Sequence, residues 1–497
     1  MSAQIKNSNK YSESFAGNVS ILAFSSISVQ LLTILAFPVT SRLFKPEAFG
    51  IMAAFISITG ILVNVASFRY ELALVLPGEK DEAAHVFTLG FLITFIVTAF
   101  TVLIIALFGR TVLILGNVPE LIRYMWLFPV TIFFTGYANL FNYWYIRLKA
   151  FREIATVRLI SKISHVGSAI GFGFLGYTSA FYLITAAIIF QISATFIYLF
   201  LSLRYFYGFI TRKCSISEIV NVAKKYIKFP LYSSWSDLLN VASQSVPIIL
   251  ITAFFGTAVA GFYSRALALV HVPFFFLSTS IRDVFFQRVS EKKSAGENIS
   301  DFIESITKRL VSIILLPMLL LILISTDLFV IIAGERWLDA GVYTRLLIPW
   351  MCVGFISFPL SVLFPVMNLQ DIQLVYNIFL FIARVAALCI GGIFIKDEEM
   401  TILLFSGVGT VFSLWMIFYL MTRNNIKFVK FISYFVLYFS YSLPFLVIAA
   451  FGKWWMKFPP LFNILSCFCL SLLYFFIVIR RDSELREFVS GFFKINL

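Results

Sequence analysis

The division of the chain into two halves is decided at Arg204–Lys228, which reads RYFYGFITRKCSISEIVNVAKKYIK between two long apolar runs. This segment holds six basic residues and one acid: Arg204, Arg212, Lys213, Lys224, Lys225, Lys228 and Glu218. Apolar residues recur at helical spacing from Ile216 to Ile227, which predicts a cationic amphipathic helix on a membrane surface, with a solvated loop as the alternative. Because positive connecting loops are retained in the cytoplasm, we place the segment there.

The composition of the chain indicates its class. Of 497 residues, 60% are apolar and only 13% are charged. A soluble protein with so little charge could not cover its surface, so the sequence predicts an all-α polytopic membrane protein. The first apolar run is too long for a signal-peptide core, and we interpret it as a retained span. A net charge of +14 would suggest nucleic acid for a soluble protein. In a membrane protein the positions of the cations matter more, and we expect no nucleic-acid partner.

About 14 apolar runs have the roughly 20 residues needed to cross about 30 Å of hydrocarbon. The predicted spans are 16–38, 49–67, 84–108, 119–143, 157–175, 178–203, 229–254, 260–281, 308–333, 343–366, 371–395, 401–421, 430–451 and 459–479. With the N-terminus inside, 27 of the 39 lysines and arginines fall at cytoplasmic ends and tails, and nine at outer ends. This bias supports cytoplasmic N- and C-termini and an even number of spans.

Two short turns suggest that the halves repeat. Phe44-Lys-Pro-Glu-Ala-Phe-Gly50 follows the first span, and Phe255-Gly-Thr-Ala-Val-Ala-Gly261 follows the seventh, at an offset of 211 residues. Six spans per half make this a parallel repeat about an axis along the membrane normal, and two facing bundles create a cavity suited to transport. The predicted parts are a six-helix bundle at 1–203, a basic hinge loop at 204–228, a second bundle at 229–421, and two appended helices with a basic tail at 422–497.

Three cations lie inside predicted spans, where a charge costs about 2.5–3.5 kcal/mol and is a functional candidate by default. They are Lys162, Arg265 and Arg384, while Arg123 stands near the outer end of the fourth span. We interpret these four residues as candidates for a cationic path that binds an anionic substrate. The alternative for each is a buried ion pair or an interhelical hydrogen bond.

Acidic and amide residues supply a second set of candidates. Asp237 is the only deep carboxylate and is the candidate for coupling to an ion, whereas Asp327 lies nearer the outer end of its span. Asn240 and Gln244 share the helical face of Asp237 and are candidates for polar lining. The alternative is that Asp237 neutralises Arg265.

Other patterns do not indicate chemistry. Gly171-Phe-Gly-Phe-Leu-Gly176 spells a dinucleotide fingerprint, but it lies within a span with no preceding strand, so close helix packing is favoured. No GxxxxGK[ST] motif is present, which excludes built-in ATP hydrolysis as the power source. The scattered histidines and mostly intramembrane cysteines predict no metal site, disulfide framework or cofactor. Asn139 and Asn142 are expected to hydrogen-bond between helices.

Two pairs of stretches carry a family resemblance. Ser41–Gly50 and Phe68–Pro77 lie early in the chain, and Gly334–Gly341 and Tyr343–Trp350 lie in its second half. These stretches resemble Wzx-type polysaccharide flippases of the multidrug/oligosaccharidyl-lipid/polysaccharide (MOP) exporter superfamily, and the resemblance covers nearly the whole chain. It implies two six-helix bundles in a V with two helices appended, and a transporter rather than an enzyme.

The resemblance also implies a substrate and a location. The substrate would be a glycan unit on undecaprenyl pyrophosphate, moved from the cytoplasmic to the outer leaflet of the bacterial inner membrane for O-antigen, capsule or exopolysaccharide synthesis. An inward proton or sodium counterflow would drive it, and the polysaccharide polymerase and chain-length machinery would be partners. Arginine suits this substrate because its planar group binds phosphate and is always charged.

Three alternatives remain beside this function. A lipid II flippase is compatible with the same fold. A multidrug exporter of the superfamily would concentrate acids in its cavity, whereas cations dominate here. A membrane glycan polymerase or ligase would need a large periplasmic loop, and the largest soluble piece, around Arg282–Lys308, is too short for a catalytic domain.

Overall fold

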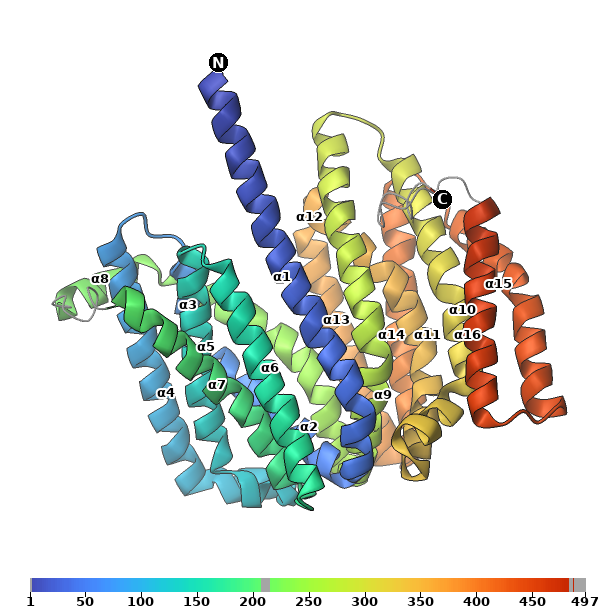
Figure 1. The fold of residues 1–497 in the computed structure, drawn as a ribbon, viewed down its shortest axis with the longest axis horizontal. Helices are drawn as coiled ribbons and strands as arrows, with labels where there is room; N and C mark the ends of the chain where they lie inside the picture. Colours follow the sequence, from blue (N-terminus) through green and yellow to red (C-terminus); the bar gives the residue numbers. More distant parts are fainter. Residues whose placement is uncertain (1, 207–214, 482–485, 487–497) are drawn as a thin grey trace. The chain divides into compact units, whose positions relative to one another are not determined.

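The computed structural model describes residues 2–206, 215–481 and 486, and every regular element in these ranges is a helix (Figure 1). The predicted all-α fold is confirmed. The chain forms two compact units, Met1–Gly261 and Phe262–Leu497. The first part of α9 therefore belongs to the first unit, and the division into repeats on either side of 204–228 stays a prediction.

The first unit is built from long helices that pack side by side. Its elements are α1 (Ser2–Leu43), α2 (Pro46–Asn64), α3 (Tyr70–Ala73), α4 (Lys80–Leu115), the 3-10 turn η1 (Pro119–Tyr124), α5 (Leu127–Arg147), α6 (Phe151–Phe174), α7 (Ala180–Phe206), α8 (Ile216–Lys225), the π turn η2 (Phe229–Ser233) and the first part of α9 (Ser234–Ser294). In Figure 1, α7 lies against α5 and α6, and α4 lies against α5. Tyr198 Oη on α7 donates to Asn142 Oδ1 on α5 at 3.1 Å, which confirms that Asn142 joins helices.

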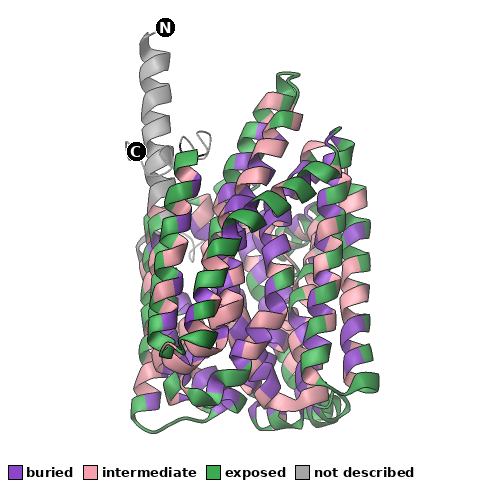
Figure 2. Cartoon of the chain, turned by 90° about the vertical axis from the view of Figure 1, so that its right-hand side faces the viewer, coloured by how far each residue is buried: buried purple, intermediate pink, exposed green. Residues whose placement is uncertain are grey.

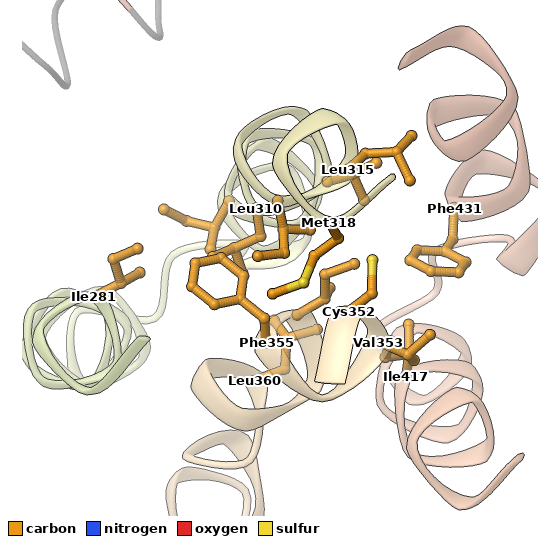
Figure 3. Packing of buried hydrophobic residues seen from close by; sticks show 14 of the residues in the cluster. Ile281, Leu310, Leu315, Met318, Cys352, Val353, Phe355, Leu360, Ile417 and Phe431 are labelled. Carbon is orange, nitrogen blue, oxygen red and sulfur yellow. The ribbon is translucent and has the colours of Figure 1, made fainter. Parts of the chain in front are cut away.

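The second unit is organised around α10, which contributes more buried apolar side chains to the core than any other helix. Its elements are the rest of α9, α10 (Ser300–Ala333), η3 (Glu335–Trp337), α11 (Leu338–Leu360), α12 (Leu363–Val366), α13 (Gln370–Cys389), η4 (Ile390–Ile395), α14 (Glu398–Arg423), α15 (Phe428–Ala450), η5 (Phe451–Trp455) and α16 (Pro460–Arg481). Figure 3 shows Leu310 and Met318 of α10 beside Cys352 and Phe355 of α11. All four are less than a tenth exposed, so this core is closely packed.

Hydropathy explains why these segments are helices. Within the described ranges, 11 helices are long and apolar enough to cross a membrane, where a helix satisfies its backbone groups internally. One of them, Phe229–Val270, is interrupted at Gly256, whose φ of 84° lies outside the helical region. This break separates the predicted spans 229–254 and 260–281. The more polar α5 and α6 coincide with two further predicted spans, and the count of 14 stays a prediction.

The surface of the described helices is apolar. Phe95, Phe100 and Leu107 on α4 are each more than half exposed. Such side chains would form an adhesive patch in water, whereas lipid tails solvate them at little cost. Figure 2 shows exposed positions along the length of the helices, with buried positions on other faces of the same helices. The pattern agrees with the predicted membrane location of the helices.

The repeated turns meet at two glycines. A Cβ at Gly50, in the first turns of α2, would stand 1.7 Å from the carbonyl oxygen of Thr257 on α9. A Cβ at Gly261 would stand 2.0 Å from the carbonyl oxygen of Pro46. Because each glycine has no side chain, the backbone of the other turn can approach it closely. The contact is therefore reciprocal. The residues matched at an offset of 211 in the sequence are neighbours in the fold.

The amphipathic helix expected in the basic segment is confirmed as α8, which excludes a solvated loop for Ile216–Lys225. Its Val222 side chain is buried, but Ile216 is 80% exposed and Val220 45% exposed. Cys214 and the preceding residues from 207 lie outside the described residues. Contact of α8 with a membrane surface stays a prediction.

An ion pair and two further polar contacts hold the α8 region against the start of α4. Lys225 Nζ pairs with Glu82 at 2.5 Å, and His85 Nε2 lies 2.8 Å from Glu218 Oε2. Tyr226 Oη also donates to Glu82, at 2.9 Å. The second half of the basic segment is therefore attached to α4 of the first unit.

The last two helices attach to α10 through polar contacts. Lys453 of η5 pairs with Asp327 at 2.8 Å, and both side chains are 19% exposed. Lys430 of α15 pairs with Glu304 at 2.6 Å. Asp327 therefore belongs to an ion pair with Lys453. Such a pair is the structural alternative to a functional role for a charge inside a span. Tyr474 of α16 donates its hydroxyl to the Ser312 carbonyl of α10 at 3.0 Å, so both of the last helices are attached to α10.

Candidate functional site

The turn after α2 places Arg69 between two carboxylates. Arg69 Nε lies 3.0 Å from Asp237 Oδ2, and its Nη1 lies 3.3 Å from Glu71 Oε1. Ser67 donates its hydroxyl to the other oxygen of Glu71, whose side chain is only 3% exposed. One guanidinium thus joins the turn to α9, and two ionised acids would leave this cluster with a net charge of one negative unit.

The backbone of this turn is strained. Phe68 and Arg69 adopt consecutive left-handed conformations, with φ of 47° and 61°. Each such residue costs about 1–3 kcal/mol when it is not glycine, so surrounding contacts must hold it in place. Tyr70, 4% exposed, supplies one of them by donating its hydroxyl to the Ala223 carbonyl at 3.0 Å. Strain of this kind concentrates at functional turns.

The first part of α9 presents the predicted polar face. Asp237 is half-buried, while Asn240 and Gln244 are exposed one and two turns further on. Gln244 Nε2 donates to Asn240 Oδ1 at 3.4 Å, which shows that the two amides share a face. Amide and carboxylate groups are costly against lipid, so such a face favours contact with water.

The predicted cations lie in different parts of the fold. Lys162 is half-buried on α6, and no hydrogen bond or ion pair reaches its ammonium from the residues that the structure describes. Arg265 is half-buried on the second part of α9, and Arg384 is half-buried on α13; both belong to the second unit. Arg123 is exposed on η1, before α5 begins.

Sequence reasoning missed the partners of Asp237. Neither Arg69 nor Glu71 was among the predicted site residues, but both belong to an ion-pair cluster with Asp237. The one signal was their place inside Phe68–Pro77, a stretch that carries the family resemblance. The acidic side chains of the candidate site can bind cations, and its basic side chains can bind anionic groups. The helices of the fold position both kinds of side chain.

Comparison with known proteins identifies the family. Residues 39–341 match the model of a family described as polysaccharide biosynthesis protein, which is more than half of the chain. The chain belongs to this family. The matched region of this family member includes Arg69, Glu71, Lys162, Asp237 and Arg265. A search of curated proteins found no match.

The family member also shares its fold with solved transporters. The lipid II flippase MurJ in an inward closed conformation is 14% identical, with a TM-score of 0.70 over 93% of this chain and 99% of that chain. An inward-facing multidrug resistance MATE transporter of the MOP superfamily is 14% identical, with a TM-score of 0.62 over 82% of this chain and 97% of that chain. These likenesses show the fold, which is the fold that the resemblance to Wzx-type flippases implies.

Proposed function

We propose that this chain is a flippase that moves polyprenyl-pyrophosphate-linked glycan units from the cytoplasmic to the outer leaflet of the inner membrane. The observation that carries the proposal is an excess of intramembrane cations in a member of a polysaccharide biosynthesis family. Lys162, Arg265 and Arg384 are half-buried on helices that coincide with predicted spans. Cations inside a membrane are costly unless they serve an anionic ligand or partner.

The physical demands of this substrate fit a transporter without covalent chemistry. The pyrophosphate and sugars cannot cross hydrocarbon unaided, whereas the lipid tail never has to leave it. Arg265 and Lys162 are proposed to contact the anionic head group, with Arg123 at the outer end of the path. An inside-negative membrane potential favours outward movement of an anion by about 2.3 kcal/mol per charge per 100 mV.

The Arg69 cluster is the proposed coupling element. Asp237 is reachable because its side chain is 38% exposed, whereas Glu71 is buried beside the same guanidinium. Protonation of Asp237, or binding of sodium there, would free Arg69 to pair with Glu71 alone. Asn240 and Gln244 would hydrate the ion as it enters. The cluster thus links ion binding on α9 to the turn that follows α2.

Deletion of the gene in its host tests the proposed function. Lipid-linked repeat units should accumulate in the inner leaflet while lipid II keeps its normal level, as measured by mass spectrometry of extracted lipids. Expression of the wild-type chain should restore surface glycan. Expression of Arg265→Ala should restore little surface glycan. Arg265→Lys should restore part of it, because lysine keeps the positive charge but lacks the planar pair of donors.

The alternatives give different results in the same strain. Accumulation of lipid II instead would identify a lipid II flippase. Normal lipid intermediates with increased drug sensitivity would identify a multidrug exporter. If Arg265 only neutralises Asp237, the double variant Asp237→Asn with Arg265→Gln should export like wild type, and the anion-binding role of Arg265 would be wrong.

A further inference from the structure

The second unit contains an arginine enclosed by aromatic rings. The guanidinium carbon of Arg384 on α13 lies 4.6 Å from the ring centroid of Trp350 on α11 and 5.2 Å from that of Phe405 on α14. The two rings meet edge to face, with centroids 5.4 Å apart and an interplanar angle of 82°. Tyr263, 1% exposed, packs against Phe405 at 6.2 Å. Four helix segments therefore build one aromatic cage.

Packing fixes this cage before any ligand arrives. A Cβ at Gly409 would stand 2.6 Å from Trp350 Cδ1, so a glycine is needed for the indole to lie against α14. Phe405, one turn earlier on the same helix, is 2% exposed. A side chain held in this way loses little further freedom on binding, which favours affinity.

The edge of the Arg384 guanidinium has no hydrogen-bond acceptor among the described residues. Its Nε is buried without a hydrogen bond, and within the described part of the chain no hydrogen bond or ion pair reaches its other nitrogens. Cation–π contacts act on the faces of a guanidinium, whereas its N–H groups point outward in the plane and need acceptors. The aromatic cage therefore stabilises the charge but leaves the donors unused.

Arg345, in the same unit, shows how a structural arginine is satisfied. Its Nη2 donates to Thr326 Oγ1 at 2.6 Å, and its Nε donates to Ser325 Oγ at 3.3 Å. Both acceptors belong to α10, so Arg345 on α11 joins two helices. Arg384 instead lies against aromatic rings, and no described hydroxyl is hydrogen-bonded to it, although an uncompensated charge inside a membrane span is unfavourable. An acceptor from outside the chain would complete the hydrogen bonds that the described residues do not supply to Arg384.

We propose that the edge of Arg384 binds an oxyanion through two parallel N–H···O bonds, with Trp350 and Phe405 holding the guanidinium in place. A planar fork stacked on aromatic rings suits phosphate and carboxylate, which accept such paired bonds. The oxyanion is the phosphate of the lipid carrier or the carboxylate of an acidic sugar. The identity of this substrate rests on the proposed function, and Arg384 adds an anion site within the second unit.

Binding of defined probes to the purified full chain in lipid nanodiscs tests the site. Native mass spectrometry would measure apparent Kd values for undecaprenyl phosphate, inorganic pyrophosphate and a glucuronate oligosaccharide. Arg384→Gln should weaken binding about ten-fold or more, the usual effect of losing charge-assisted hydrogen bonds. A loss confined to the two phosphate probes assigns the site to the carrier, and a loss confined to glucuronate assigns it to the sugar.

Two further variants separate binding from folding. Arg384→Lys keeps the charge and should bind with intermediate affinity, because it lacks the paired donors. Arg345→Lys is the matched control, which should lower the melting temperature through its contacts with α10 but leave every Kd unchanged. If Arg384→Gln does not fold, a wild-type Kd for all probes in Arg384→Lys would overturn the proposal. Wild-type affinities in a folded Arg384→Gln would do the same.

The outcome for this site and the outcome for the proposed function are distinguishable. If the wild-type chain does not move lipid-linked glycan but still binds pyrophosphate through Arg384, the proposed function is wrong and the oxyanion site stands. If the wild-type chain moves the glycan while Arg384→Gln binds and transports normally, the function stands and the site is wrong.

Discussion

At the scale of single residues, Arg69 has the most constrained environment in the candidate site. It occupies a left-handed backbone position and joins Glu71, which is 3% exposed, to Asp237, which is 38% exposed. Removing one member of a buried pair leaves an uncompensated charge, whereas an exposed partner can be solvated. The two acids should therefore respond differently to loss of the arginine.

Arg69→Met should destabilise the folded protein by about 3 kcal/mol, because buried Glu71 loses its partner. The double variant Arg69→Met with Glu71→Gln should regain most of that stability, since a neutral amide can still bond the Ser67 hydroxyl. Thermal unfolding in detergent measures both. Equal melting temperatures for the single and double variants would show that Glu71 does not depend on Arg69.

Sequence reasoning found the charges of the site but not their partners. Asp237 and Arg384 were recognisable because a charge within an apolar run is conspicuous. The pairing of Asp237 with Arg69 was not recognisable, because tertiary packing brings together two residues that are far apart in the sequence of the first unit. Trp350 and Phe405 likewise reach Arg384 from two other helices, and nothing local to residue 384 points to them.

At the scale of elements, the crossing of α2 with α9 depends on two glycines. Glycine normally costs a helix about 1 kcal/mol relative to alanine, so its presence needs a reason. Here the reason is backbone proximity, since Cβ atoms at Gly50 and Gly261 would meet carbonyl oxygens at 1.7 and 2.0 Å. The repeat in the sequence thus corresponds to a reciprocal contact.

Gly50→Ala should destabilise the protein by several kcal/mol, because backbone cannot give way as a flexible side chain can. Gly167→Ala on α6 is the matched control, since a Cβ there meets nothing within 4 Å. That control should be neutral or stabilising by at most about 1 kcal/mol. The melting temperatures of the two variants in the same detergent measure both effects. Equal changes would show that the backbone of α9 does not approach Gly50 closely.

The attachment of α8 should loosen when its ion pairs are removed. Glu82→Gln removes the negative charge that pairs with Lys225, and should speed hydrogen exchange of the α8 amides by about two- to five-fold, as expected for exposed pairs. Hydrogen bonding to Glu82 raises the pKa of Lys225 above 10.5. The contribution of Lys225 is therefore complete below pH 10.5 and is lost as the pH rises through the raised value. Unchanged exchange in Glu82→Gln would mean that apolar contacts alone hold α8.

The helices themselves were largely predictable. Runs of about 20 apolar residues cannot leave backbone groups unpaired in lipid, so they form helices whatever their neighbours are. The gap predicted between 254 and 260 corresponds to the break at Gly256. The short elements α3 and α12 were not predicted, because four-residue helices carry no periodic signal.

At the scale of the whole molecule, the orientation in the membrane is a prediction from the 27-to-9 distribution of cations. Native Cys214, in the basic segment, should react with a membrane-impermeant thiol reagent only in inside-out vesicles. A variant with the other four cysteines replaced by alanine isolates this signal. Labelling of Cys214 in intact cells with a permeabilised outer membrane would reverse the orientation.

Transport of the lipid-linked glycan is the central claim, and reconstitution measures it most directly. Proteoliposomes would carry a fluorescent polyprenyl-pyrophosphate-linked glycan in both leaflets, and an impermeant quencher would report the fraction that reaches the outside. With the wild-type chain the protected inner-leaflet fraction should disappear under an imposed membrane potential. With Arg265→Ala it should persist at equal protein content, and a fluorescent phosphatidylcholine should stay protected throughout. Persistent protection of the glycan with correctly inserted wild-type protein would contradict the account.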